Sequence, residues 1–207
     1  MTRIKLCGLS RPCDIEAANA LKPEYIGFVF APKSRRYVSP ETAEALRKML
    51  DPAIRAVGVF VREDLERIAG LLERGIIDLA QLHGNEDEKY IARLRALTGK
   101  PLIRAFRVDS PADLADARES TADFILLDNG AGGTGESFDW SLLQGFGRPY
   151  FLAGGLNPEN AAAAVETLRP FAVDVSSGIE TDGVKDGKKM KAFVDAVRTV
   201  SRKDDEL

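Results

Sequence analysis

An acidic residue follows an uninterrupted apolar run in the second half of this chain and opens a loop rich in glycine. Residues 124–127 are all apolar, Asp128 comes next, and four glycines lie among the following seven residues. An apolar run without alternation is typical of a strand buried on both faces of a parallel sheet. Parallel α/β proteins place their chemistry at the carboxyl ends of such strands. Asp128 is therefore a candidate catalytic group, and the alternative is that it only caps a turn.

A second reactive side chain stands at the end of an earlier apolar segment. Cys7 follows residues 3–6 and precedes Gly8. A thiol, with an ordinary pKa of ~8.5, accepts a proton near neutral pH if its surroundings lower that pKa. The carboxyl of Asp128 has an ordinary pKa of ~3.9, so its pKa must be raised before it can donate a proton near neutral pH. The two groups together suit an isomerisation that moves a proton, and the competing interpretation is that Cys7 is a small buried apolar residue.

The elements that must position these groups alternate along the whole chain. The spacing predicts strands at residues 3–6, 25–30, 54–61, 77–82, 102–108, 122–127, 150–153 and 171–175. It predicts helices at about residues 11–21, 40–50, 63–74, 87–97, 110–120, 140–143, 157–168 and 188–200. Eight strand–helix units without a dividing linker favour a single α/β domain over residues 1–207, a (β/α)8 or TIM barrel with its active site at the carboxyl ends of the strands.

The main alternative fold is an open, doubly wound sheet. No G-x-G-x-x-G sequence follows the first predicted strand, where a dinucleotide site would need it. The closed barrel is therefore the better interpretation. The charged tail at residues 201–207 is predicted to be frayed.

Composition narrows the function classes. The formal net charge of -3 offers no basic surface for nucleic acid or membrane. Cys7 and Cys13 match neither a disulfide framework nor a zinc spacing, and His83, the only histidine, excludes metal sites that need two. No apolar run approaches the ~18 residues of a membrane span, and the N-terminus lacks a signal-peptide core. We therefore expect a cytoplasmic, reduced protein that holds no metal.

Two glycine-rich segments follow the last two predicted strands. Gly154-Gly155 and Ser176-Ser177-Gly178 both approach the start of a helix. In such barrels, backbone N–H groups and a helix N-terminus in these two loops commonly bind one phosphate. The pair predicts a phosphate site, and the alternative is that the glycines only make tight loops.

Six motifs lie at or near the predicted strand ends. They are Lys5-Leu6-Cys7-Gly8; Gly27-Phe28-Val29-Phe30 with Ser34-Arg35-Arg36-Tyr37-Val38; Gln81-Leu82-His83-Gly84; Leu127-Asp128 with Gly133-Thr134-Gly135 and Phe138-Asp139-Trp140; Leu152-Ala153-Gly154-Gly155-Leu156; and Val173-Asp174-Val175-Ser176-Ser177-Gly178-Ile179-Glu180. Together, and in this order, they resemble the phosphoribosylanthranilate isomerase family of tryptophan biosynthesis. The resemblance covers about residues 4–197, which makes it far more specific than any single motif.

The resemblance implies an Amadori rearrangement of N-(5-phosphoribosyl)anthranilate to 1-(o-carboxyphenylamino)-1-deoxyribulose 5-phosphate, without cofactor or metal. Carried over by position, it implies that Asp128 is the general acid at the ring oxygen and Cys7 the general base at the sugar's C2. Arg36 would meet the anthranilate carboxylate, Asp174 would lie near the amine, and His83 would help to position the substrate. The phosphate would be held by the backbone N–H groups of Gly154, Gly155, Ser177 and Gly178.

The residues leave several points open. Arg107 either contacts the substrate or pairs with Asp128, Gln81 is a candidate polar core residue, and His83 is also explained by a structural role. The glycines of residues 129–136 suggest a lid. The alternative functions are a non-catalytic sugar-phosphate-binding barrel and a related barrel isomerase or lyase. A small phosphosugar is the expected partner, without nucleic acid or membrane, and the chain is expected to be a monomer or a homodimer.

Overall fold

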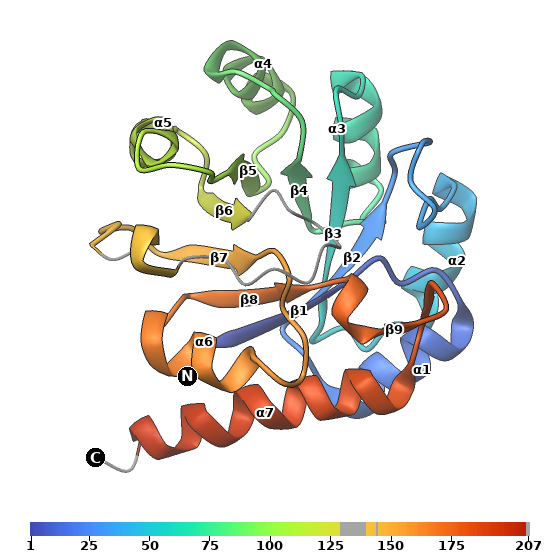
Figure 1. Cartoon of the computed structure of the whole chain (residues 1–207). Helices are drawn as coiled ribbons and strands as arrows, with labels where there is room; N and C mark the ends of the chain where they lie inside the picture. The colour runs from blue at the N-terminus through green and yellow to red at the C-terminus, as the bar shows by residue number, and fades with distance from the viewer. Residues whose placement is uncertain (129–139, 144, 206–207) are drawn as a thin grey trace.

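Eight parallel strands close into a barrel in the computed structural model of this chain, which describes residues 1–128, 140–143 and 145–205, the last five by their backbone alone. Each strand pairs with the next one along the chain, and β8 pairs with β1 to close the ring (Figure 1). The predicted (β/α)8 barrel is confirmed. The strands are β1 (Arg3–Cys7), β2 (Tyr25–Val29), β3 (Arg55–Phe60), β4 (Leu79–Leu82), β5 (Leu102–Arg107), β6 (Phe124–Asp128), β7 (Tyr150–Ala153) and β8 (Ala172–Val175).

Helices surround the barrel in the alternation that the sequence predicts (Figure 1). Two of them, which begin at Asp113 and Ala161, start later than expected. Before Ala161, the Asn157 side chain accepts the backbone N–H groups of Glu159 and Asn160 and so forms a turn first. The helices are α1 (Pro12–Leu21), α2 (Pro40–Met49), α3 (Leu65–Glu73), α4 (Glu88–Leu97), α5 (Asp113–Glu119), the 3-10 helix η1 (Trp140–Leu143), α6 (Ala161–Leu168) and α7 (Gly187–Asp205).

The core has one layer inside the barrel and another between barrel and helices. Because side chains alternate along a strand, Tyr25 and Val57 point inward, where they pack with Phe151 and other apolar residues. Their neighbours Ile26 and Ala56 point outward and pack with the helices. A third small cluster, Cys7, Val29 and Val59, lies above the inner layer toward the carboxyl ends of the strands. This apolar floor supports the site described below.

A short hairpin after β8 was not predicted from the sequence. The 3-10 helix η2 (Ser177–Ile179) leads into β9 (Glu180–Thr181), which pairs with β10 (Val184–Lys185) before α7 begins. Two-residue strands leave no periodic signal. In Figure 1 the segment lies at the end of the barrel that also carries the loop after β2. The hairpin therefore adds residues to that end of the barrel.

The last helix is longer than expected, since α7 continues to Asp205. The predicted fraying of residues 201–207 stays a prediction, because the side chains there and residues 206–207 lie outside the part that the structure describes. The predicted lid at residues 129–136 also lies outside the described residues. None of the described helices is long and apolar enough to cross a membrane.

Replacing Gly58 by alanine is expected to destabilise the barrel. A Cβ at this position of β3 would lie 2.6 Å from Cδ1 of Ile77 and 2.8 Å from Cε2 of Phe60. Both side chains are fully buried, so they have little room to yield. We expect Gly58→Ala to lower the free energy of unfolding by about 1–3 kcal/mol, measured by urea denaturation.

Gly70→Ala is the matched control. Gly70 lies within α3, and a Cβ there would meet nothing within 4 Å. Because alanine favours helix over glycine, this variant should be up to about 1 kcal/mol more stable than the parent. A Gly58→Ala variant as stable as the parent would contradict the packing of β3 against the helix layer.

Candidate functional site

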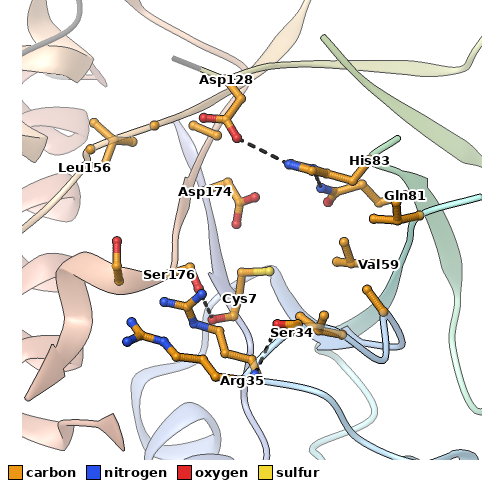
Figure 2. A pocket seen from close by; sticks show the side chains of 18 residues that line it. Cys7, Ser34, Arg35, Val59, Gln81, His83, Asp128, Leu156, Asp174 and Ser176 are labelled. Carbon is orange, nitrogen blue, oxygen red and sulfur yellow. Dashed lines mark hydrogen bonds and ion pairs between the residues drawn. The ribbon is translucent and has the colours of Figure 1, made fainter. Parts of the chain in front are cut away.

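A cavity of about 730 Å³ opens at the carboxyl ends of the barrel strands. Figure 2 shows the side chains that line it, with Cys7, Asp128, Asp174 and His83 facing a common space. The cavity is lined by eight of the nine site residues predicted from the sequence, namely Cys7, Arg36, His83, Asp128, Gly154, Gly155, Asp174 and Ser177. The barrel therefore brings together residues that lie far apart in the sequence.

Two neighbouring glycines, one on β2 and one next in the chain, leave room for the side chain and backbone of Cys7. It ends β1 and is buried, and a Cβ on Gly27 of the neighbouring strand β2 would lie 2.6 Å from its Sγ. The next residue, Gly8, has a φ of 80°, which favours glycine. Its N–H donates to the carbonyl of Gly27. The thiol thus occupies space that a side chain on β2 would otherwise fill.

A buried ion pair lies directly below the thiol. Lys5, two residues before Cys7 on the same inward face of β1, is fully buried, and its Nζ lies 2.8 Å from Oδ2 of Asp174 on β8. Burial lowers the pKa of Lys5, but Asp174 and, to a smaller extent, Cys7 outweigh this effect and the pKa is raised. Lys5 is therefore an ammonium ion. The other oxygen, Oδ1 of Asp174, is buried and has no hydrogen-bond partner among the described residues, although the residue lines the cavity.

The surroundings of Cys7 shift the pKa of its thiol. From the sequence, a lowered pKa is the condition for Cys7 to act as a base, but burial raises the pKa of Cys7 above its ordinary value. The Lys5 and Lys185 ammonium groups act in the opposite direction and favour the thiolate, while Asp174 opposes it. Cys7 is accordingly a thiol in the free protein.

Asp128 ends β6 and has an unpredicted neighbour. Nε2 of His83 lies 3.4 Å from Oδ2 of Asp128, and Nδ1 of His83 lies 2.8 Å from Nε2 of Gln81, as the dashed lines in Figure 2 indicate. Arg107 does not pair with Asp128, since its Nε donates to Asp109 at 2.7 Å. Gln81 is buried in β4 and lines the cavity together with His83. The candidate acid is thus linked through the histidine to a buried amide.

Arg36 is fixed by a carboxylate that sequence reasoning missed. Nε and Nη2 of Arg36 donate to the two oxygens of Glu180 at 2.6 and 2.9 Å. Arg35 and Lys185 also donate to Glu180, each at 2.7 Å. Burial alone would raise the pKa of Glu180, but the hydrogen bonds from Arg36 and Lys185 lower it to about 2. Three cations surround one anion, so this side of the cavity carries a surplus of positive charge.

The two glycine-rich loops lie together at the cavity. Gly154 and Gly155 have φ values of 87° and 63°, a conformation that favours glycine. Within the described residues, the backbone N–H groups of Gly154, Gly155, Ser177 and Gly178 make no hydrogen bond to another protein group. Free N–H groups in two adjoining loops can bind an anion.

Gly178 is the one predicted residue that does not line the cavity. A Cβ there would collide with the backbone carbonyl of Leu156, in the loop after β7. Gly178 therefore lets η2 pack closely against that loop. The structure gives it a packing role in addition to the N–H group expected from the sequence.

Comparison with known proteins points to one family. The family model for N-(5'phosphoribosyl)anthranilate (PRA) isomerase matches residues 4–196. An N-(5'-phosphoribosyl)anthranilate isomerase of Endomicrobium trichonymphae is 46% identical over 204 residues, covering 97% of this chain and 100% of that protein. The crystal structure of phosphoribosyl anthranilate isomerase from Thermotoga maritima has a TM-score of 0.87 at 38% identity, covering 96% of this chain and 100% of the other.

A further similar crystal structure contains a bound molecule. It is phosphoribosyl anthranilate isomerase in complex with reduced 1-(o-carboxyphenylamino)-1-deoxyribulose 5-phosphate, with a TM-score of 0.84 and 37% identity. The match covers 96% of this chain and 100% of the other.

The two cysteines should differ in reactivity. Iodoacetamide is expected to alkylate Cys13 well before Cys7 at neutral pH, because Cys13 is exposed whereas Cys7 is buried and its thiol pKa is raised. Labelling of Cys7 should accelerate as the pH rises, since the thiolate is the reactive form. Peptide mass spectrometry after timed quenching measures both rates, and Cys13→Ser isolates the slow site. Faster labelling of Cys7 than of Cys13 at neutral pH would contradict this account.

Proposed function

This chain belongs to the N-(5'-phosphoribosyl)anthranilate isomerase family, and we propose that it performs the Amadori rearrangement of that family with Asp128 as general acid and Cys7 as general base. The reaction turns an N-glycoside of anthranilate into a 1-amino-1-deoxyketose phosphate within tryptophan biosynthesis. The observation that carries the proposal is one cavity that holds an acid, a base and two loops with free N–H groups.

The first step is opening of the ribose ring. Asp128 gives its proton to the ring oxygen while the bond between that oxygen and C1 breaks. The lone pair of the anthranilate nitrogen forms the C1=N bond, which leaves a protonated Schiff base. Asp128 becomes a carboxylate in this step, so a hydrogen-bond donor beside it favours the transfer.

The second step is removal of the proton on C2. Cys7 acts in this step as a thiolate, after its thiol proton has passed to solvent, and takes the proton from C2. The C–H electrons form the C1=C2 bond while the π electrons of C1=N return to nitrogen, which gives an enolamine that tautomerises to the ketone. Lys5 and Lys185 favour the thiolate, and the positive charge of the Schiff base adds to their effect. At this stage of the reaction, these positive charges therefore counteract the burial that raises the thiol pKa in the free protein.

Three groups orient the substrate in this proposal. Glu180 holds the Nε–Nη2 edge of Arg36, which leaves the Nη1–Nη2 edge for the carboxylate of the anthranilate. The unpaired Oδ1 of Asp174 accepts the anthranilate N–H. The free N–H groups after β7 and β8 bind the phosphate. His83 positions the side chain of Asp128 in this proposal, since its Nε2 lies 3.4 Å from Oδ2 of the acid.

The alternative functions differ from this one in what the site does after binding. A non-catalytic sugar-phosphate-binding barrel would keep the phosphate loops and have no use for Cys7 and Asp128 in one cavity. A related barrel isomerase or lyase would act on another phosphosugar. The cytoplasmic location and the monomeric or homodimeric state stay predictions.

Turnover of freshly made phosphoribosylanthranilate tests the proposal, followed by the loss of anthranilate fluorescence. The protein should be active, and Cys7→Ser and Asp128→Asn should each lower kcat by at least about 100-fold, the usual effect of losing a general acid or base. Cys13→Ser, which alters an exposed thiol, is the matched control and should keep full activity.

Either of two results would contradict the proposal. A folded protein that binds a product analogue without turnover would identify a binding barrel. Full activity of one of the two variants would remove that residue from the mechanism.

A further inference from the structure

The only histidine of the chain lies between a buried amide and the candidate acid. His83 follows β4 directly, and Gln81 lies two residues earlier on the same face of that strand. The amide of Gln81 is 1% exposed, so its position is fixed by the barrel wall. Figure 2 shows the three side chains in a row from Gln81 through His83 to Asp128.

Hydrogen-bond chemistry limits what the imidazole can do in this row. Nε2 of Gln81 is a donor only, and it lies 2.8 Å from Nδ1 of His83. Nδ1 must therefore offer its lone pair. The proton of a neutral imidazole is then on Nε2, which lies 3.4 Å from Oδ2 of Asp128.

We propose that Gln81 is a positioning residue that holds His83 in the Nε2–H tautomer, so that His83 donates a hydrogen bond to the Asp128 carboxylate formed during the reaction. The inference rests on the proposed function, because it concerns the state of Asp128 after proton transfer. A donor at this place stabilises the conjugate base and so strengthens the acid. The contact of 3.4 Å shortens when the charge forms, as catalytic contacts do on going from free enzyme to transition state.

The opposite arrangement is chemically distinct. If the amide of Gln81 were turned over, Oε1 would accept Nδ1–H, and the lone pair of Nε2 would face Asp128. That arrangement suits a protonated Asp128, which could donate to the histidine, but it puts two acceptors together once Asp128 has lost its proton. Oε1 of Gln81 is buried without a partner among the described residues, and Nε2 would take that place if the amide were turned over, so in either arrangement the contact with His83 is the one hydrogen bond that the amide makes within that part of the chain. The tautomer of His83 distinguishes the two arrangements.

Nitrogen NMR of the free protein reads this tautomer directly. With one histidine in the chain, labelling with 15N-histidine gives signals from a single imidazole. At a pH well above ~6.5, the ordinary pKa of an imidazole, we expect the proton on Nε2 and none on Nδ1. An Nδ1–H signal in the parent protein would overturn the inference, whatever the activity of the enzyme.

Two substitutions of Gln81 test whether this residue sets the tautomer of His83. Gln81→Glu places an acceptor beside Nδ1 and should move the proton to Nδ1, whereas the size-matched Gln81→Met should leave a mixture of tautomers. We expect Gln81→Glu to lower kcat roughly ten-fold or more with little change in KM, because the hydrogen bond to the charged form of Asp128 is lost. Gln81→Met should fall between this variant and the parent.

The outcomes separate this inference from the proposed function. An unchanged Nε2–H tautomer in a folded Gln81→Glu variant would overturn the role of Gln81 while leaving the acid and base intact. The Nε2–H tautomer together with an active Asp128→Asn variant would instead refute the proposed acid. If Gln81→Glu does not fold, Gln81→Met and the spectrum of the parent protein still decide the inference.

Discussion

The site depends on the buried ion pair between Lys5 and Asp174, which lies where the last strand meets the first. The two residues face each other across the β1–β8 seam, and no water-exposed surface is available to Lys5. Breaking such a pair by removing one partner typically costs about 3–5 kcal/mol, because a charge remains buried. The pair therefore fixes the relative position of these two strands. Cys7 lies two residues beyond Lys5, and Ser176, two residues beyond Asp174, donates to the carbonyl of Cys7 at 3.2 Å.

The net charge of the side-chain clusters becomes more positive from the β1–β8 seam toward the mouth of the cavity. The innermost pair is neutral overall, whereas Glu180 is shared by Arg35, Arg36 and Lys185 and leaves a positive surplus. Such a surplus favours an anionic substrate, and the free N–H groups after β7 and β8 add to it. It also favours the thiolate of Cys7, since Lys185 contributes directly. In the proposed mechanism, Lys185 therefore serves both the binding of an anionic substrate and the activation of the base.

Much of the site could be predicted from the sequence, because apolar runs fixed where the strands end. Cys7 and Asp128 stand directly after such runs, and the order of eight units placed them at one end of a barrel. The ion pair of Lys5 could be found only by noting that Lys5 shares the inward face with Cys7, in a strand whose one other charged residue is Arg3 at its first position. Gln81 and His83 share a face for the same reason, two residues apart.

Other parts of the site carry no local signal. Glu180 and Lys185 lie in strands of two residues, and their function depends on Arg36, which is 144 residues away from Glu180. The thiol pKa could not be predicted either, since it depends on burial that only the folded barrel creates. The sequence also left open whether Arg107 pairs with Asp128 across neighbouring strand ends, and its Nε donates instead to Asp109, two residues further along the chain.

The assignment of acid and base to separate steps is tested most directly with a substrate that carries deuterium at C2 of the ribose. The account predicts a primary isotope effect on the residual turnover of Cys7→Ser, because removal of the C2 proton then limits the rate. Asp128→Asn should show little isotope effect, since opening of the ring, which does not break that bond, becomes limiting. An isotope effect in Asp128→Asn and none in Cys7→Ser would contradict the assignment of the two roles.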